Sequence, residues 1–428
     1  MQKKLHAIYR TLQDRELKAL ASIYTHRCMS VDQIFTLHYS ENAQTDSYCK
    51  QKMEYMVSKG LLEKEVTNRH EVYFLTTDGI DIVREYLQLP SNIFDANKKI
   101  VRRGYFRAGE LRMIPRNINH QMALNQFFID FHERLGDKIK YKYYDEKYIT
   151  DFADIRPDGL IKAFDIDFFI EIDMSTESKG QLHEKWENYR RFLNSREYKY
   201  KERKIIVLFV IENTRVPETR IDLTKNTINN RIMDLIDDNL DFIIDTRKNI
   251  IDYLYNRYLY IKGDFVEPID TVRDIFEDKG FRCDLGVNIQ RFVGGFNFAY
   301  YARILNKDKT IAIKDNKVQE YVIDSYHDKP YSIIKKIQSL KHANLAYREM
   351  LGRDLTYIVV ADYLEDIYHD LKIIDLLYID NVVYTTIERL KKYPLPKALV
   401  TLDAYGNVSH FGDYGLSKVI YEFNLEEA

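Results

Sequence analysis

Cysteine is scarce in this sequence, and its scarcity excludes two structural devices. The chain has 3 cysteines in 428 residues. Cys28, Cys49 and Cys283 lie far apart, without a CxxC pair or a Cys/His spacing. An odd number of widely separated thiols does not build a disulfide framework, and structural zinc sites need closely spaced ligands. We therefore expect a reducing compartment and no structural zinc.

Glycine, proline and long apolar runs are also infrequent. The chain has 16 glycines and 8 prolines, whereas 45% of its residues are hydrophobic. It can therefore bury sizeable cores, and we expect several ordered domains without a low-complexity linker. No run approaches the roughly 18 apolar residues of a membrane span, and the N-terminal segment MQKKLHAIYR lacks an apolar signal core. The sequence predicts a cytoplasmic protein without membrane contact.

Neither sign of charge dominates. The 64 basic residues stand against 66 acidic residues, for a net charge of −2. This balance excludes a protein that coats nucleic acid through bulk charge, so any nucleic-acid affinity must come from local patches. The motifs G-x-x-x-x-G-K-[ST], G-x-G-x-x-G and G-x-S-x-G are absent as well. Nucleotide-driven motors, dinucleotide-binding enzymes and serine hydrolases therefore lack their usual signatures.

The first ninety or so residues show helical and strand patterns in a characteristic order. Apolar residues recur at helical spacing from Asp14 onward, Ser30 is a good N-cap, and Gly60 suits a left-handed helix end. A last helix is expected to begin with Thr77 or Asp78 as its cap. The expected elements are helices at 14–27, 30–39, 46–60 and 78–88 and strands at 61–66 and 71–77. This order is typical of a winged-helix domain.

We predict this winged helix over residues 1–95, with polar side chains on its third helix and on the turn between its strands. In such a domain the third helix enters the major groove, and the turn flanks it on the DNA backbone. The residues expected to contact DNA are Gln44, Thr45, Ser47, Tyr48, Lys50, Gln51 and Lys52 on the helix and Arg69 and His70 on the turn. Two alternatives stay open: a polar face that is only solvated, and a winged helix that binds protein.

A basic connector follows over residues 96–142. Its segment KKIVRRGYFRAGELRMIPR holds seven basic residues against one acidic residue, the steepest local charge excess in the chain. We interpret it as a phosphate-contacting arm, with Arg102, Arg103 and Arg107 among the contacts. A solvated linker is the alternative. An amphipathic helix, NHQMALNQFFIDFHERL, comes next, and we expect His120 at its start to be a structural cap.

Residues 143–265 carry the motif that most strongly suggests chemistry. Pro157-Asp158 is followed after twelve residues by Glu171-Ile172-Asp173, within the order hairpin, helix, buried strand, long connection, strand. This arrangement resembles the PD-(D/E)XK nuclease fold. The resemblance implies that Asp158 and Glu171, together with a backbone carbonyl, would hold Mg²⁺ or Mn²⁺.

The same motif departs from the nuclease pattern at one catalytic position. Asp173 stands where those enzymes have the lysine that polarises the attacking water. Lys185, on the next helix, is the candidate to supply this charge from a shifted position. The alternative is a core that keeps its metal-type carboxylates for structure or for binding DNA or a partner, and the missing lysine favours this alternative.

Residues 311–390 repeat the order of this segment. A separation of 32 positions lies between Asp173 and Ile205 and also between Asp324 and Thr356, and a buried strand opens at the end of each interval. Equal spacing suggests an internal duplication, although coincidence between two ordinary α/β units is the alternative. Val322 replaces Glu171 in the second copy, and no Pro-Asp precedes it. We therefore expect a degenerate domain over residues 266–428.

Several motifs together carry a resemblance to a known family. They are the winged-helix pattern, RNINHQMALNQFFIDF, RPDG with FFIEIDMSTES, and the following helix with Lys185 and Tyr189. The most specific part is the acidic strand followed by Thr176-Glu177. Over roughly residues 11–215 the chain is similar to the replication-relaxation family of bacterial plasmids and mobile elements. The resemblance implies a role in plasmid replication or in relaxation of plasmid DNA, and it does not imply cleavage.

These patterns predict an α/β (α+β) protein in which a winged helix precedes two tandem restriction-endonuclease-like domains. The leading hypothesis is a DNA-binding protein of a plasmid or other mobile element, acting in replication, DNA relaxation or transcriptional control. The alternatives are a Mg²⁺-dependent endonuclease that nicks DNA and a dimeric scaffold that recruits replication proteins. The expected partner is double-stranded DNA, with a second copy of the chain and replication proteins as further candidates.

Overall fold

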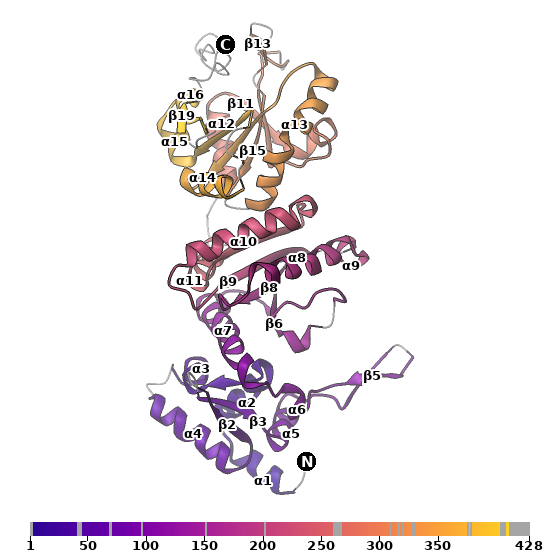
Figure 1. The fold of residues 1–428 in the computed structure, drawn as a ribbon, viewed down its shortest axis with the longest axis vertical. Helices are drawn as coiled ribbons and strands as arrows, with labels where there is room; N and C mark the ends of the chain where they lie inside the picture. Colours follow the sequence, from indigo (N-terminus) through magenta and orange to yellow (C-terminus); the bar gives the residue numbers. More distant parts are fainter. Residues whose placement is uncertain are drawn as a thin grey trace. The chain divides into compact units, whose positions relative to one another are not determined.

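The protein is a mixed α/β structure with several sheets, seen in a computed structural model (Figure 1). By its internal contacts the chain divides into two compact units, and β9 contributes residues to both. The first unit comprises Met1–Thr176, Phe209–Thr214 and Asp245–Tyr255, and the second comprises Glu177–Leu208, Arg215–Ile244 and Asn256–Ala428. The structure describes residues 3–40, 45–67, 71–95, 97–149, 152–200, 203–259, 268–308, 310–314, 317–318, 320–326, 330–374, 376, 379–402 and 408–410.

The N-terminal part of the first unit has the helices and strands predicted from the sequence, in the predicted order. It also has a short first helix and a two-residue strand that were not predicted. The elements are α1 Lys3–Thr11, α2 Asp14–His26, β1 Met29–Ser30, α3 Val31–His38, α4 Asp46–Ser58, β2 Leu62–Val66, β3 Glu71–Leu75 and α5 Thr77–Tyr86. The strands form an antiparallel sheet of order β1-β3-β2.

Local residues explain where these helices begin and end. The Ser30 hydroxyl accepts a hydrogen bond from the backbone N–H of Gln33 at 3.2 Å and caps α3. Gly60 has a φ of +74° just beyond α4, as its left-handed role predicts. The expected cap of α5 was wrong by one or two residues, because Thr76 accepts the hydrogen bond from Gly79 at 3.1 Å. Thr76 has the extended backbone that an N-cap needs, whereas Thr77 is already helical.

Packing orients α4 within this part of the unit. Cys49, Met53 and Met56, spaced by about one helical turn, are fully buried in the core formed with α2, α3 and β3. The opposite side of α4 is exposed over Ser47, Lys50 and other polar residues. The helix is therefore held by its apolar stripe and presents its polar stripe outward.

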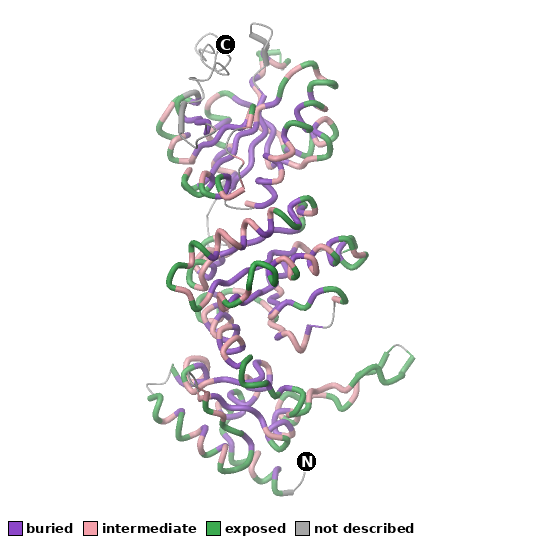
Figure 2. The backbone as a smooth tube through the Cα atoms, viewed as in Figure 1, coloured by how far each residue is buried: buried purple, intermediate pink, exposed green. Residues whose placement is uncertain are grey.

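The remainder of the first unit contains an antiparallel ribbon, a long helix and three strands. Its elements are β4 Asn92–Phe94, β5 Ile100–Arg103, α6 Ala108–Leu111, α7 Pro115–Phe131, β6 Lys142–Asp145, β7 Gly159–Ala163, β8 Ile166–Asp173 and α11 Arg247–Leu254. The residues of β8 are all buried (Figure 2). Strand β7 pairs with β8 as an antiparallel hairpin. The ribbon of β4 and β5 is largely exposed and projects from the rest of its unit.

A five-stranded sheet has the order β10-β9-β8-β7-β6. The elements that complete it are α8 Lys179–Asn194, α9 Arg196–Lys199, β9 Lys204–Ile211, α10 Pro217–Arg231 and β10 Leu240–Thr246. The segment expected as a long connection before the last strand contains α10, so that expectation was wrong. Its apolar residues are too few to mark a helix from sequence, and its buried side chains include Arg220, Thr224 and Thr227.

The C-terminal part of the second unit is built on a seven-stranded sheet of order β11-β12-β15-β16-β17-β18-β19. The pairs β15–β16 and β16–β17 are parallel. Its helices are α12 Pro268–Asp278, α13 Pro330–Leu351, α14 Leu364–Ile373, α15 Ile387–Lys392 and α16 Leu395–Ala398. Its strands are β11 Phe281–Leu285, β12 Tyr300–Ile304, β15 Glu320–Ser325, β16 Thr356–Ala361, β17 Val382–Thr386, β18 Val400–Leu402 and β19 Val408–His410, with the separate pair β13 Ile313–Lys314 and β14 Lys317–Val318.

The two larger sheets share one order of elements. In both, a helix precedes two antiparallel strands, and a third strand, a helix, a fourth strand, a helix and a fifth strand follow. The strand order β10-β9-β8-β7-β6 has its counterpart in β17-β16-β15-β12-β11. The equal spacing found in the sequence thus falls on equivalent elements. The predicted division into four segments stays a prediction.

No helix in the described part of the chain has the length and apolar character needed to cross a membrane.

Candidate functional site

A cleft in the first unit gathers the polar groups around Pro157-Asp158. It has a volume of about 810 Å³ and lies among the first turns of α7, the segments flanking β6 and β7, and the residues that follow β8 and β9. Its lining residues are Arg27, Met113, Arg116, Asn117, Asn119, His120, Gln121, Leu124, Glu146, Lys147, Arg156, Asp158, Met174, Thr176 and Asn213. A cleft of this size lies in the range of ligand sites, about 300–1,000 Å³.

A histidine bridges Asp158 and the backbone of β8 inside this cleft. Asp158 Oδ2 accepts a hydrogen bond from the Ile172 N–H at 2.7 Å and lies 3.2 Å from Nε2 of His120. The same Nε2 lies 3.1 Å from the carbonyl oxygen of Ile172. Because a carbonyl oxygen only accepts, Nε2 carries the hydrogen. The expected capping role of His120 was wrong, since Ile114 is the N-cap of α7 and His120 lies in its second turn.

Glu171 and Asp173, the other strand carboxylates of the predicted site, are both buried on β8. The β7–β8 ladder ends at the pair Gly159–Ile170, so Asp158 and Glu171 are the next opposed residues beyond it. Asp173 Oδ1 accepts a hydrogen bond from the N–H of Ser175 at 2.9 Å. The strand register thus leads to Asp158 and Glu171 as opposed residues, and the carboxylate of Asp173 caps the turn after β8.

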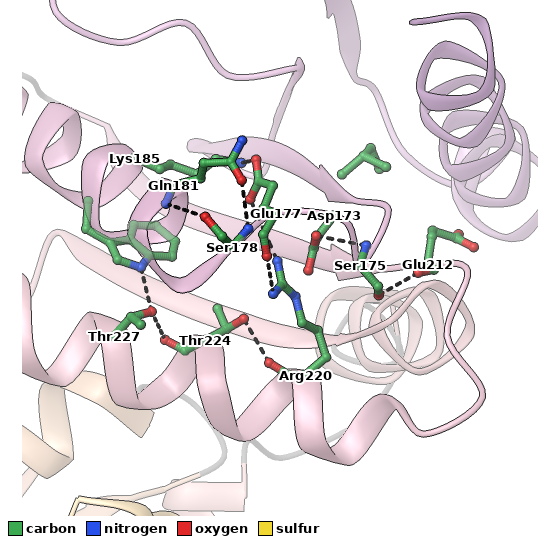
Figure 3. A network of polar contacts seen from close by, with 12 residues as sticks. Asp173, Ser175, Glu177, Ser178, Gln181, Lys185, Glu212, Arg220, Thr224 and Thr227 are labelled. Atoms are coloured by element: carbon green, nitrogen blue, oxygen red, sulfur yellow. Dashed lines mark hydrogen bonds and ion pairs between the residues drawn. The ribbon is translucent and has the colours of Figure 1, made fainter. Parts of the chain in front are cut away.

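Lys185, the candidate substitute for the missing lysine, lies on α8 in the second unit. Its Nζ lies 3.3 Å from Oε1 of Glu177, and Arg220 donates to the backbone carbonyl of Glu177 at 2.7 Å (Figure 3). Ser178 caps α8 by accepting from the N–H of Gln181 at 3.3 Å. Lys185 thus forms an ion pair with the residue that precedes the N-cap of its own helix.

One of the cationic side chains that line the cleft, Arg27, is buried. Arg27 is only 7% exposed, has a φ of +67°, and its Nε has no hydrogen-bond partner. One of its terminal nitrogens lies 3.5 Å from Glu146 and 4.0 Å from Asp145. Burial raises the pKa of Asp145 to about 6, and hydrogen bonds from the Lys147 N–H and from Gln121 oppose this shift.

The residues predicted to contact DNA on α4 are mostly exposed. Thr45, Ser47, Lys50 and Gln51 are exposed, and Tyr48 and Lys52 are half-buried. Lys50 lies 3.5 Å from Glu71 on β3, and Lys52 forms an ion pair with the buried Glu16 at 2.8 Å. Thr45 also caps the helix. Gln44, Arg69 and His70, the other predicted DNA contacts, lie outside the residues that the structure describes.

The basic connector forms the exposed ribbon of β4 and β5, called the arm here and defined as residues 92–103. Arg102, Lys98 and Lys99 are exposed on it, and Arg107 is exposed just beyond it. Arg103 is half-buried and forms an ion pair with Glu110 at 2.8 Å. Part of the predicted charge excess is thus compensated within the fold.

Together the fold and the cleft define a mixed α/β protein with a carboxylate pair and a cationic cleft in its first unit. Residues 20–208 of this chain match the model of the replication-relaxation family, so the resemblance seen in the sequence is confirmed over these residues. Comparisons with curated proteins and with solved structures give no match.

Most cleft residues were not singled out as site residues in the sequence, among them Arg156, Arg27 and His120. Arg156 stands directly before Pro157-Asp158, and this position next to the motif is a signal that could have identified it. Arg27 follows an ordinary amphipathic helix, and His120 lies among amide residues on α7. For these two residues only the tertiary structure places the side chain beside Asp158 or within the same cleft.

Proposed function

We propose that this chain is a DNA-binding protein of a plasmid or another mobile element, acting in its replication, in relaxation of its DNA or in control of its transcription. The observation that carries this proposal is the match of residues 20–208 to the replication-relaxation family. The element order of residues 14–86 supports it, because α2, α3 and α4 followed by the β2–β3 hairpin and α5 give the order expected of a winged helix.

In this proposal α4 reads DNA from the major groove. Its buried stripe fixes the helix, while Ser47, Lys50 and Gln51 are exposed on the other side. Amide and ammonium groups on an exposed helix form hydrogen bonds with base edges and phosphates. The Lys50 ammonium lies 3.5 Å from Glu71, an exposed pairing that contributes little and exchanges readily for a phosphate.

The arm supplies backbone contacts beside α4. Lys98, Lys99 and Arg102 are exposed on a two-stranded ribbon, and ribbons of this kind fit DNA grooves. Ile100 and Val101 are more than 60% exposed on the same ribbon. Apolar side chains on a basic ribbon suit contact with the minor groove, where such groups insert between base steps.

The test of this proposal begins with plasmid-wide mapping of bound DNA, which supplies a duplex for binding measurements. Lys50→Ala and Gln51→Ala are expected to weaken binding to this duplex by about 1–3 kcal/mol each and to change the preferred bases. Lys391→Ala, which removes one exposed ammonium from α15, is the matched control. If no DNA is enriched, or if the α4 variants bind like the control, the proposal fails.

Metal-dependent nicking is the second candidate, because Asp158 and Glu171 are opposed beyond the end of the β7–β8 ladder. The contacts of this site do not fit a metal ion. His120 and the Ile172 N–H donate to Asp158 Oδ2, and His120 also engages the Ile172 carbonyl, the backbone oxygen that the nuclease resemblance assigns to the metal. Among the described residues, no group of three His, Cys, Asp or Glu side chains is placed to hold a metal ion.

A nicking assay separates the two candidates. Supercoiled plasmid is incubated with the protein and Mg²⁺ or Mn²⁺, and nicked circles are measured against Asp158→Ala and Glu171→Ala. Nicking that disappears in both variants would establish the nuclease. If the wild type and both variants give the same background level of nicked circles and the protein binds DNA, only the binding function is supported.

We also propose that the shared element order of the two larger sheets reflects an internal duplication, with the second copy degenerate. The β12–β15 ladder places Tyr301 opposite Val322, where the first copy has Asp158 opposite Glu171. The second copy therefore lacks both carboxylates of the pair.

A further inference from the structure

The cleft in the first unit has more positive than negative charge on its walls. Its cations are Arg27, Arg116, Lys147 and Arg156, and its carboxylates are Glu146 and Asp158. Both carboxylates have partners inside the cleft, because Glu146 pairs with Arg27 and Asp158 with His120. Among the described residues, the other three cations form no ion pair.

A buried donor in this cleft has no acceptor. Arg27 is more than nine-tenths buried and lines the cleft, and its Nε has no hydrogen-bond partner. A buried, unpaired guanidinium nitrogen is costly unless a ligand supplies an acceptor. An arginine presents its nitrogens in a planar fork that matches the oxygens of a phosphate group.

In the nuclease fold that the motif resembles, the Asp158 carboxylate would bind a metal ion, and the contacts of His120 oppose this role here. A metal ion between Asp158 and the Ile172 carbonyl would compete with the His120 N–H, which engages both oxygens. The Asp158 oxygen that would face an anion is therefore already occupied by hydrogen bonds from His120 and the Ile172 N–H. The cleft therefore combines cationic side chains with a hydrogen-bonded group made of His120, Asp158 and the backbone of Ile172.

We propose that this cleft binds a phosphodiester group of a single nucleic-acid strand without a metal ion, through Arg27, Arg116 and Arg156. Its volume of about 810 Å³ is in the range of small-ligand sites, which suits a short stretch of one strand rather than a double helix. Asn117, Asn119 and Thr176 add neutral donors along the walls. The inference deepens the proposed DNA-binding function by adding a second contact, distinct from α4, that takes a separated strand.

Fluorescence anisotropy tests this proposal with the full chain and a labelled oligothymidylate of about ten nucleotides, in EDTA and at several salt concentrations. The double variant Arg116→Ala/Arg156→Ala is expected to bind the strand at least tenfold more weakly. Its salt dependence should also fall by about 1.4 in log–log slope, because two phosphate contacts are lost. Both side chains are exposed, so folding is preserved. The matched control is Arg191→Ala/Arg196→Ala, which removes two exposed charges from α8 and α9.

A parallel measurement with double-stranded DNA separates this inference from the proposed function. Lys50→Ala should weaken duplex binding and leave strand binding within twofold, whereas the cleft variant should do the reverse. If the cleft variant binds the oligothymidylate like the control, the inference is overturned, whether or not α4 binds duplex. Strand binding that appears only when Mg²⁺ replaces EDTA at constant ionic strength would also overturn it. Loss of strand binding in the cleft variant alone supports it even if α4 proves inactive.

Discussion

Nε2 of His120 lies 3.2 Å from Oδ2 of Asp158, so a helix and the start of a strand are joined at the predicted nuclease position. The same nitrogen donates to the carbonyl of Ile172. One imidazole N–H therefore occupies the space between the carboxylate and the backbone oxygen that a metal ion would need. The acidic motif thus takes part in a hydrogen-bonded link between α7 and β8.

The bridge made by His120 should contribute modestly to stability. His120→Ala removes one donor from Asp158 and from Ile172, and we expect the free energy of unfolding to fall by about 1 kcal/mol, because water replaces part of the contact at this half-exposed site. Urea denaturation followed by circular dichroism measures the change. His120→Gln, whose amide is also a donor, should recover part of it. Equal stability of all three proteins would show that the bridge contributes nothing.

Acid should weaken the first unit through a buried histidine. Burial lowers the pKa of His26 from 6.5 to about 3, and its ring packs against Phe128 and Tyr143 with centroids 4.6 Å and 5.1 Å away. The folded protein thus keeps this imidazole neutral, whereas the unfolded chain takes up a proton below pH 6.5. The contribution of His26 to the free energy of unfolding is therefore fully present above pH 6.5. It falls by about 1.4 kcal/mol per pH unit as the pH drops from 6.5 toward 3.

His26→Phe tests this dependence, since phenylalanine suits the aromatic surroundings and does not titrate. Urea midpoints measured from pH 8 to pH 4 should decline less steeply for the variant than for the wild type. At pH 8 both side chains are neutral, so the difference there has no contribution from titration of His26. A variant with the same decline as the wild type would refute the role of His26. Burial also lowers the pKa of the neighbouring His38 to about 4, so part of the decline with falling pH should remain in the variant.

A buried ion pair in the C-terminal part of the second unit should be costly to break on one side. Lys336 Nζ lies 2.9 Å from Asp324 Oδ2, which also accepts a hydrogen bond from the Tyr357 hydroxyl at 2.8 Å. Both charged side chains are less than 10% exposed. Lys336→Met leaves a buried carboxylate without its cation, and we expect a loss of about 3–5 kcal/mol.

The double variant Lys336→Met/Asp324→Asn provides the control for this pair. It removes both charges and keeps an amide oxygen for Tyr357, so most of the lost stability should return. Guanidinium denaturation of the wild type, both single variants and the double variant gives the coupling free energy. Additive losses would contradict a direct interaction.

Two neighbouring arginines of the arm should differ in their effect on DNA. Arg102 is exposed, whereas Arg103 already pairs with Glu110 at 2.8 Å. Arg102→Ala should therefore weaken binding to all duplex sequences and reduce the salt dependence by about 0.9 in log–log slope. Arg103→Ala should change it less. Anisotropy titrations with two unrelated duplexes measure both variants, and a larger effect of Arg103 would contradict this assignment.

The order of helices and strands in the first ninety residues could be predicted from sequence because local rules set it. Ser30 and Gly60 act through their own backbone, and the apolar stripe of Cys49, Met53 and Met56 follows helical spacing. Each of these elements could be predicted without knowing where the other elements lie. The cap of α5 was misplaced because Thr76 and Thr77 are both good caps, and the choice depends on which of them keeps an extended backbone.

The helix α10 was missed for a related reason. Its buried face includes Thr224 and Thr227, which satisfy their hydroxyls by local and tertiary hydrogen bonds, one of them from the indole of Trp186 at 2.9 Å. Periodicity counts apolar residues only, so a helix that buries polar side chains against partners gives a weak signal.

The amino-acid sequence by itself determined the acidic motif, the family resemblance, the repeated spacing and most elements of the N-terminal part, because each depends on residues close together in the chain. The tertiary structure decided which side chains meet across long separations. It brought His120 onto Asp158, placed Arg27 in the wall of the same cleft, and paired Lys336 with Asp324. Residues distant in sequence become neighbours only when helices pack on sheets, and no local pattern specifies that packing.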